Sequence, residues 1–348
     1  MLKVKHVVTA VAIALVATGA MASNFRAADQ VYVPAAGHLA GGSGTFISDV
    51  FISNLSSDPV TVSVILSQGP NGAQTTFNNV ISLAANERKE MNDFIVNTLG
   101  LSATASTFGQ LIFNGCKTGG NCTLTCPGAD ANGNCPDFRN ISVESRIFSI
   151  PPNSANPATA PTTGQLFSGI PWYNFVSSSA NGVGLDKVFI TGIRNTGSVG
   201  QAGTYRSNIG LVNASQFSTT TLRVKLFDGK TDTQIGADFT QTLQPLGQAQ
   251  PNISVMFPSF AGSGATNAWV QVTQENTVAT SDAAANNCGD GCPAFFAYGS
   301  ILDNLSGDAT TLEPQFFVPL TNSAIQCIYN STCKSGLSNV IHRAVAHQ

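Results

Sequence analysis

Charged side chains are scarce in this chain: Asp, Glu, Lys and Arg make up 10% of the 348 residues, as 19 acidic and 16 basic side chains. The few Lys and Arg are spread along the sequence, which excludes nucleic acid as an expected partner because phosphate binding needs them clustered. Histidine is scarcer, with 4 residues, and none lies close to the cysteines in zinc-ligand spacing. We therefore expect no metal and no cofactor.

Signatures of nucleophilic catalysis are also missing. No serine has Gly at both positions that G-x-S-x-G requires, and the S-x-x-K match at residues 331–334 lacks the companion motifs of penicillin-recognising enzymes. His38 begins a predicted strand and has no nucleophile signature to serve, so a structural role is expected. The sequence predicts a protein that is not an enzyme.

No apolar run reaches the length of a membrane-spanning helix. The run at residues 7–16 follows Lys3 and Lys5 and precedes small residues that end at Ala22, the pattern of a signal peptide at residues 1–22. Without Lys3 and Lys5, 14 of the 16 basic residues remain against 19 acidic ones, a net charge of about −5. The mature chain is expected to be soluble, secreted to the cell surface or surroundings (the periplasm is the alternative), with no membrane insertion after signal cleavage.

What the sequence does contain is a repeat. The segment GTFISDVFISNLS at residues 44–56 returns without a gap as GTYRSNIGLVNAS at residues 203–215. Most differences stay within a residue class, and the alignment places Asp49 on Asn208 and Asn54 on Asn213. Two copies of one domain are therefore predicted.

Short alternating segments follow in both copies and predict paired strands. They lie at residues 60–66 and 220–226, 77–83 and 239–246, 110–114 and 269–273, and 143–148 and 297–302. Turn dipeptides at 71–72 and 228–229 predict that the next strand folds straight back. The expected fold class is all-β, with two tandem immunoglobulin-like antiparallel β-sandwich domains and disulfide-stapled loops.

The predicted domain order has four parts after the signal peptide. They are a first sandwich repeat at 31–171, an interdomain connector at 172–187, a second sandwich repeat at 188–320 and a C-terminal tail at 321–348. One helical turn is expected at residues 94–99, with Asp93 among its capping residues and Gly100 as its stop.

All 8 cysteines lie in the predicted mature chain, which favours four disulfides and no free thiol in an exported protein. The disulfide candidates are Cys116, Cys122, Cys126, Cys135, Cys288, Cys292, Cys327 and Cys333. Proximity favours the pairs Cys288 with Cys292 and Cys327 with Cys333. The other four are expected to pair among themselves in the loop at 116–135, with their connectivity open.

Both repeats lengthen the same hairpin and stiffen it with cystine, at residues 116–135 and 286–293. A stiffened loop loses less entropy on binding, so these loops are the predicted interaction surface. Its candidate residues are Asp130, Asn132, Asn134 and Asp290. Residues 130–134 begin like a calcium loop, but Cys135 and Ile141 replace the required Gly and Glu, which favours a polar turn. The alternative role for the bridges is protection from proteases.

Two further patterns have a structural and a functional interpretation. Trp172, Tyr173 and Trp269 could form an aromatic platform for a sugar, and core or interdomain packing is favoured over it. Seven asparagines lie in N-x-[ST] sequons and are expected to be incidental to a polar surface. They are Asn54, Asn121, Asn140, Asn213, Asn252, Asn304 and Asn330.

The segment at 33–41 leading into 44–56, followed by the segments at 145–148 and 163–167, resembles a family of exported bacterial immunoglobulin-like sandwich proteins. The second copy is similar to the family's later repeat at residues 298–304. The resemblance covers most of residues 31–320 and rests on strand and turn signatures. It implies a cell-surface or secreted accessory module, and it supplies no catalytic residue.

The expected function is that of an exported, non-enzymatic protein with a structural or adhesive role outside the cell. Its partners would be an extracellular protein, a glycan or further copies of itself. The alternative is an extracellular glycan- or protein-binding module that uses the Cys-stapled loops. An aromatic cluster exposed beside the Cys-stapled loops would favour glycan binding, and an unpaired apolar edge strand would favour assembly with other subunits.

Overall fold

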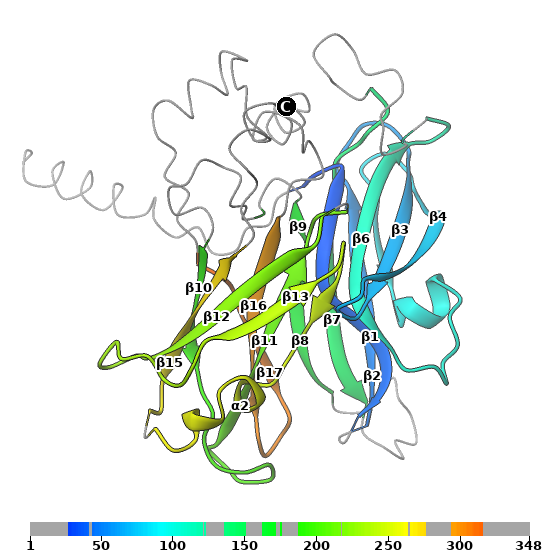
Figure 1. Ribbon diagram of the computed structural model, residues 1–348. Coiled ribbons are helices and arrows are strands. Elements are labelled where there is room, and N and C mark those ends of the chain that lie inside the picture. The colour runs from blue at the N-terminus through cyan, green and yellow to red at the C-terminus, as the bar shows by residue number, and fades with distance from the viewer. Residues whose placement is uncertain are drawn as a thin grey trace, which may run out of the picture.

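The computed structural model describes residues 27–41, 44–120, 122, 136–150, 162–171, 175, 187–216, 218–263, 265–275 and 294–315. Strands dominate this part of the chain, and every strand pairing in it is antiparallel. The expected all-β, sandwich-like fold is confirmed (Figure 1). No helix among these residues is long and apolar enough to cross a membrane.

The first half of the chain contributes strands β1 to β9. They are β1 (Gln30–Gly41), β2 (Gly44–Asn54), β3 (Val60–Gln68), β4 (Ala73–Leu83), β5 (Arg88–Met91), β6 (Thr107–Lys117), β7 (Ile141–Ile150), β8 (Thr163–Ser168) and β9 (Ile170–Pro171). One layer has the order β4-β3-β6-β1, and the other has β5-β2-β7-β8. The last residues of β1 cross over to pair with β2, so the two layers are joined at one end.

The second half contributes strands β10 to β17. They are β10 (Lys187–Ile193), β11 (Tyr205–Asn213), β12 (Thr220–Asp228), β13 (Phe239–Leu243), β14 (Gln248–Ala249), β15 (Ala268–Gln274), β16 (Phe295–Asp303) and β17 (Ala309–Leu312). One sheet has the order β13-β12-β15-β10 and the other β14-β11-β16-β17. Strand for strand, this is the order of the first half. The predicted strand segments in both copies are confirmed.

This strand order differs from that of an immunoglobulin domain. In the constant-type immunoglobulin fold the first strand lies beside the second, and the seventh lies beside the sixth. Here β1 lies beside β6 over most of its length, and β7 lies beside β2. The structure supports the coarser assignment, an all-β sandwich-like fold in each half.

Local hydrogen bonds agree with the strand-by-strand correspondence. The N–H of Gly37 donates to Ser48 Oγ at 2.8 Å, and the N–H of Arg194 donates to Ser207 Oγ at 3.0 Å. Ser48 and Ser207 occupy the same column of the aligned segments at 44–56 and 203–215. The registers therefore give a residue-by-residue equivalence between the halves, which we use below.

The helical turn of the first half differs from its prediction. It is a π-helical turn, η2 (Phe94–Thr98), and the Asp93 side chain does not cap it. Asp93 has φ +42 and turns its carboxylate toward His38 instead, so it is not available to the turn. The predicted stop is confirmed, because Gly100 has φ +68 and lies in open space. The second half has the short helices α2 (Ile253–Met256) and η5 (Pro258–Phe260) at the same place in its order.

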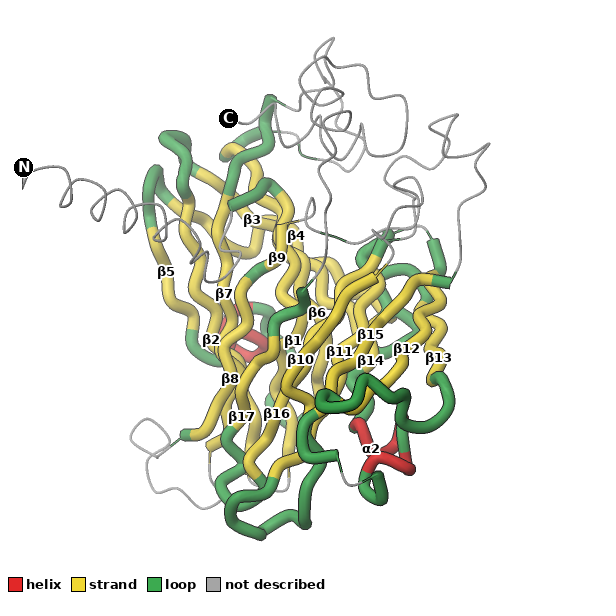
Figure 2. Tube along the Cα trace, turned by 90° about the vertical axis from the view of Figure 1, so that its left-hand side faces the viewer, coloured by secondary structure: helices red, strands yellow, loops and turns green. Residues whose placement is uncertain are grey.

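Each half has an apolar core between its two sheets, because alternate strand residues face inward. The core of the first half also takes in side chains from the second half: Val212, Ala214, Leu246, Phe296 and Tyr298. Strands β8 and β17 lie side by side (Figure 2), where Thr311 Oγ1 donates to the carbonyl of Leu166 at 2.7 Å. The two halves are therefore packed together through a buried interface.

Candidate functional site

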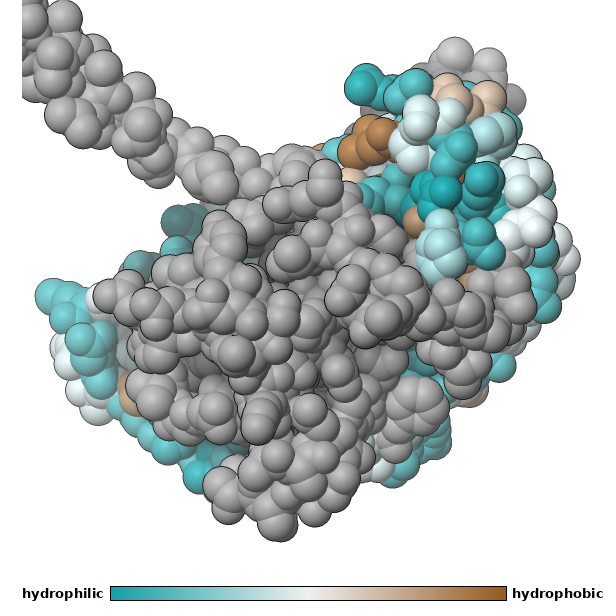
Figure 3. All heavy atoms as spheres, turned by 90° about the horizontal axis from the view of Figure 1, so that it is seen from above, coloured by the Kyte–Doolittle hydropathy of each residue, from teal (hydrophilic) through white to brown (hydrophobic). Residues whose placement is uncertain are grey.

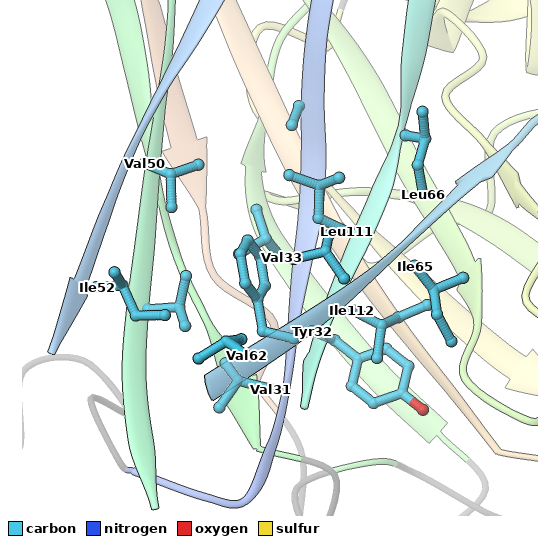
Figure 4. Packing of buried hydrophobic residues seen from close by; sticks show 14 of the residues in the cluster. Val31, Tyr32, Val33, Val50, Ile52, Val62, Ile65, Leu66, Leu111 and Ile112 are labelled. Atoms are coloured by element: carbon cyan, nitrogen blue, oxygen red, sulfur yellow. The ribbon is translucent and has the colours of Figure 1, made fainter. Parts of the chain in front are cut away.

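The outer face of the β4-β3-β6-β1 sheet is covered in part by the second half, over β1, β3 and β6. We call Tyr32, Ser67 and Gln110 the first face; they lie on β1, β3 and β6 and are almost fully buried. Figure 4 shows Tyr32, with its hydroxyl, on the opposite side of this layer from Val31 and Val33. The inward residues fill the core of the first half, so the first face is free to meet the second half.

The segments of the second half that cover the first face are residues 213–215 and 244–247, which we call the second corner. Tyr32 Oη donates to the carbonyl of Ala214 at 3.3 Å, and Ser67 Oγ donates to that of Leu246 at 2.8 Å. Gln110 Nε2 donates to the same Leu246 carbonyl. Nearby, the N–H of Gln244 donates to the carbonyl of Pro70 at 2.9 Å. Directional bonds to main-chain groups fix the second corner on the first face.

The equivalent positions in the second half are aromatic and only half-buried. We call Phe189, Trp269 and Phe227 the second face; they lie on β10, β15 and β12 and face away from the core. The register pairs Phe227 with Trp269, as it pairs Ser67 with Gln110. The second half therefore presents three aromatic rings on the face that the first half uses to receive its neighbour.

The three rings form one continuous cluster. Trp269 stacks on Phe227 with 4.2 Å between ring centroids and 12° between ring planes, and Phe189 lies 5.9 Å from Trp269 on a tilted plane. Trp269 Nε1 donates to Asp232 Oδ1 at 3.2 Å. Because one indole face is already covered by Phe227, the cluster offers ring edges as well as ring faces to a ligand.

Polar and charged side chains border the aromatic cluster on the same face. Arg223, Lys225 and Gln271 face outward on β12 and β15. Arg223 pairs with Glu275, and Arg223 and Lys225 each lie 3.6 Å from a carboxylate oxygen of Asp238. An apolar centre with a polar rim is typical of a recognition surface.

The second face was not predicted from the sequence. Trp269 was expected in the core or between domains, and this is wrong: Trp269 alternates with the buried Val270 and Ala268 and lies on the outer side of β15. The strand period alone assigns Trp269 and the core residue Val270 to opposite faces. Trp172 and Tyr173 lie outside the described residues.

The predicted interaction loops are not tested, because Asp130, Asn132, Asn134 and Asp290 lie outside the described residues. Of the predicted bridges, Cys116–Cys122 is present, and it agrees with pairing inside the first loop. Cys116 lies within strand β6 and is buried, so the stapled segment begins inside the sheet and not in a loop. This disulfide is consistent with an exported protein.

His38 has a carboxylate partner that the sequence did not indicate. Its Nδ1 lies 3.0 Å from both carboxylate oxygens of Asp93, and the N–H of Asp93 donates to Asp49 Oδ1 at 2.9 Å. Burial raises the pKa of Asp49 above its usual value. This group ties β1, β2 and the start of η2 together.

The corresponding group in the second half is uncharged. The registers place Asn195 and Asn208 at the positions of His38 and Asp49, and Asn252 directly precedes the helical turn of its half as Asp93 does in the first. There Asn252 Nδ2 donates to Asn208 Oδ1 at 3.0 Å. Amides therefore make the same link between strand and helical turn without an ionisable group, which indicates a structural role for His38 and its partners.

The sequons have a structural explanation. Asn54, Asn213 and Asn252 each accept, through Oδ1, the N–H of the Ser two residues later. This is an Asx turn, which needs Asn followed by a short polar residue. Asn54, Asn213 and Asn304 are buried, so the expectation that all the sequons belong to the surface is wrong for these three.

One sheet edge in the described part of the chain, that of strand β4, is polar. The edge strand β4 exposes Gln, Thr and Asn side chains, and a register shift and Asn79 at φ +51 interrupt its pairing with β3. From above, the described surface is mainly hydrophilic (Figure 3). Charged, polar and irregular edges resist strand-to-strand addition.

No family model and no curated protein matches this chain. Among solved structures, it is similar to the N-terminal CBM22-1-CBM22-2 tandem domain of Xyn10C from Paenibacillus barcinonensis, with 12% identity, a TM-score of 0.18, and coverage of 80% of this chain and 85% of that one. A likeness with this TM-score supports no conclusion about fold or function.

Proposed function

We propose that this protein is an exported, non-enzymatic structural or adhesive protein that works by binding through the second face. The observation that carries the proposal is the contrast between equivalent positions. Gln110 and Ser67 are closed under the second corner, whereas Trp269 and Phe227 are aromatic and half-exposed. Exposed aromatic side chains beside polar ones are typical of binding surfaces.

A protein partner is favoured over a glycan. A sugar ring stacks on a free aromatic face, and Phe227 already covers one face of Trp269, with Phe189 tilted against it at 5.9 Å. The glycan alternative retains support from Gln271 and Lys225, whose side chains lie beside the rings and can bond to hydroxyl groups. The polar, irregular edge strand β4 does not favour assembly by strand addition at that edge.

The two halves of the chain also support an origin by duplication. The two halves share strand order, register and the hydrogen bonds of Asn54 and Asn213. We propose that they are two repeats of one domain, of which the first has its outer face occupied by the second. The second repeat then has the only such face left open among the described residues.

The test compares retention of the wild type and the variant W269Q/F227S on the native cell envelope or matrix of the source organism. The variant installs the side chains of Gln110 and Ser67, which this backbone position accommodates in the first half. Thr273→Asn, which copies Asn114 on the same face, is the matched control. We expect the control to be retained like the wild type and the double variant to be lost. Equal retention of all three contradicts the proposal.

A further inference from the structure

The first half has a corner of its own, formed by residues 54–56 and 84–87, which we call the first corner. Its main-chain bonds repeat those of the second corner. The N–H of Asn54 donates to the carbonyl of Glu87 at 2.9 Å, and the N–H of Asn213 donates to that of Gly247 at 2.8 Å. Asn86 and Leu246, at equivalent positions, both have φ +56. The two corners therefore have the same backbone shape.

The two corners differ in exposure. Leu55 is 52% exposed, whereas its equivalent, Ala214, is 4% exposed against the first face. Asn86 is exposed, whereas Leu246 is 1% exposed. Each copy of the chain thus has one closed pair, the first face with the second corner. It also has one open pair, the second face and the first corner, at separate places in the same molecule.

The open pair is complementary where the closed pair makes contact. Tyr32 touches Ala214 in the closed pair, and the equivalent open residues are Phe189 and Leu55. An aromatic ring would meet an exposed aliphatic side chain there, which buries apolar surface on both sides. Trp269 would meet the turn that carries Asn86, as Gln110 meets Leu246.

A charged pair replaces a close backbone contact. Pro70 and Gly247 touch in the closed pair, where a Cβ on Gly247 would lie 2.4 Å from the carbonyl oxygen of Pro70. The equivalent open residues are Lys230 and Glu87, which have opposite charges, and Glu87 also lies 3.5 Å from Lys89 of its own chain. The N–H of Ala84, which donates to Glu87, lowers the pKa of Glu87 and keeps it ionised. Opposite charges at one contact favour this pairing over others.

We infer that copies of this protein associate head to tail, with the first corner of one copy bound to the second face of the next. This inference rests on the proposed function, since it names the occupant of the second face as a second copy of the chain. The interface is heterologous, so repetition gives a filament or, if the rotation closes, a ring. The intermolecular contact would join the same surfaces as the intramolecular one, but at a wider spacing, because Asp232 and Glu87 stand where the closed pair has Gly72 and Gly247. A Cβ on either glycine would lie 2.1 or 2.4 Å from a carbonyl oxygen of the other half.

The first experiment measures the mass of the full mature protein by sedimentation from micromolar to millimolar concentration. We expect the average mass of the wild type to rise with concentration. Leu55→Asp and Trp269→Gln should each weaken association by about tenfold or more, because the first puts a charge against Phe189 and the second removes the largest ring of the second face. The matched control is Leu305→Asp, since Leu305 is 61% exposed in a turn outside both surfaces. The control should associate like the wild type.

The second experiment mixes the two association-deficient variants. Leu55→Asp retains an intact second face, and Trp269→Gln retains an intact first corner, so an equal mixture should form dimers and stop there. An isologous interface would not produce this pattern. In a third arm, Lys230→Glu should weaken association, and adding Glu87→Lys should restore it.

Three outcomes overturn the inference. The first is a wild type that stays monomeric at every concentration. This outcome overturns the inference whether the second face is empty or covered by another segment of the same chain. The second is a Leu55→Asp variant that associates as strongly as the wild type. The third is an equal mixture of the two variants that forms no dimer. The proposed function fails separately, when W269Q/F227S leaves envelope retention unchanged. A monomeric wild type with loss of retention in that variant overturns the inference alone.

Discussion

The two halves have the same strands in the same order, yet the same sheet face is closed in one and open in the other. Tyr32, Ser67 and Gln110 donate hydrogen bonds to the second corner. The equivalent residues Phe189, Phe227 and Trp269 are half-buried and cluster with one another. The shared fold therefore does not determine which face binds a partner. A few outward-facing side chains determine it.

The largest effect is expected where the halves touch most closely. A Cβ on Gly72 would lie 2.1 Å from the carbonyl oxygen of Pro245, and Gly72 has φ +61. We predict that Gly72→Ala lowers the free energy of unfolding by about 3 kcal/mol, through overpacking and left-handed strain together. Chemical denaturation followed by circular dichroism measures it.

Gly69 is the matched control for this prediction. It lies in the same turn with φ +66, and nothing lies within 4 Å of an added Cβ. Gly69→Ala should cost only about 1 kcal/mol, the conformational part alone. If the two variants lose equal stability, the close contact between the halves is not present in solution.

The second prediction concerns Asn213 and Asn54. Asn213 Nδ2 donates to the carbonyls of Ser218, Leu243 and Gln244, and Asn54 Nδ2 donates to two carbonyls at the equivalent place. Each change to Ala should lower the free energy of unfolding by about 2 to 3 kcal/mol, because buried carbonyls lose their donor. If only one of the two variants loses unfolding free energy, the two asparagines do not have equivalent roles in the repeats.

The third prediction concerns the stability of the second face. W269Q/F227S should remain folded and lose about 1 to 2 kcal/mol of unfolding free energy, because the stacked pair and its buried area are removed. Thermal and denaturant unfolding of the variant and of Thr273→Asn provide the comparison. A loss above about 4 kcal/mol, typical of a core deletion, would show that these rings serve the fold rather than binding.

The smallest effect is expected at the ionisable group. Burial raises the pKa of Asp49 in the folded protein, so its protonated form stabilises the fold below the unfolded pKa, and this contribution is lost as pH rises through the folded value. Asp49→Asn, which copies Asn208, should therefore raise stability at neutral pH by about 1 kcal/mol or less. The gain should fade in acid.

The reverse change, Asn208→Asp, is the matched variant in the second half. It should lower stability at neutral pH and leave it nearly unchanged in acid. Unfolding curves at several pH values measure both variants. A loss of stability in Asp49→Asn at neutral pH would contradict the role assigned to burial.

Strand positions could be predicted from the sequence because alternation and turn residues are local signals. The segments at 60–66 and 220–226 became β3 and β12, as their period-2 pattern indicated. The strand order could not be predicted, since β1 beside β6 depends on pairing between residues distant in sequence. The capping role expected of Asp93 failed because the competing partner, His38, lies 55 residues away.

The candidate site was predictable only in part. The period of β15 already assigns Trp269 and the core residue Val270 to opposite faces. Gln110 faces a buried interface, whereas Trp269 faces an open surface. This difference depends on how the two halves pack together, and no local sequence signal encodes that packing. The loops at 116–135 and 286–293 were favoured because cystine is conspicuous in a sequence, whereas an outward aromatic row across three strands is not.

The central claim is that the second face is open in the isolated protein. The most direct measurement is quenching of Trp269 fluorescence by acrylamide at low protein concentration, in a Trp172→Phe variant that leaves Trp269 as the remaining one of 2 tryptophans. The account predicts emission at long wavelength that acrylamide quenches efficiently, and protection as concentration rises. Short-wavelength emission that resists acrylamide at every concentration would show a closed face and contradict the account.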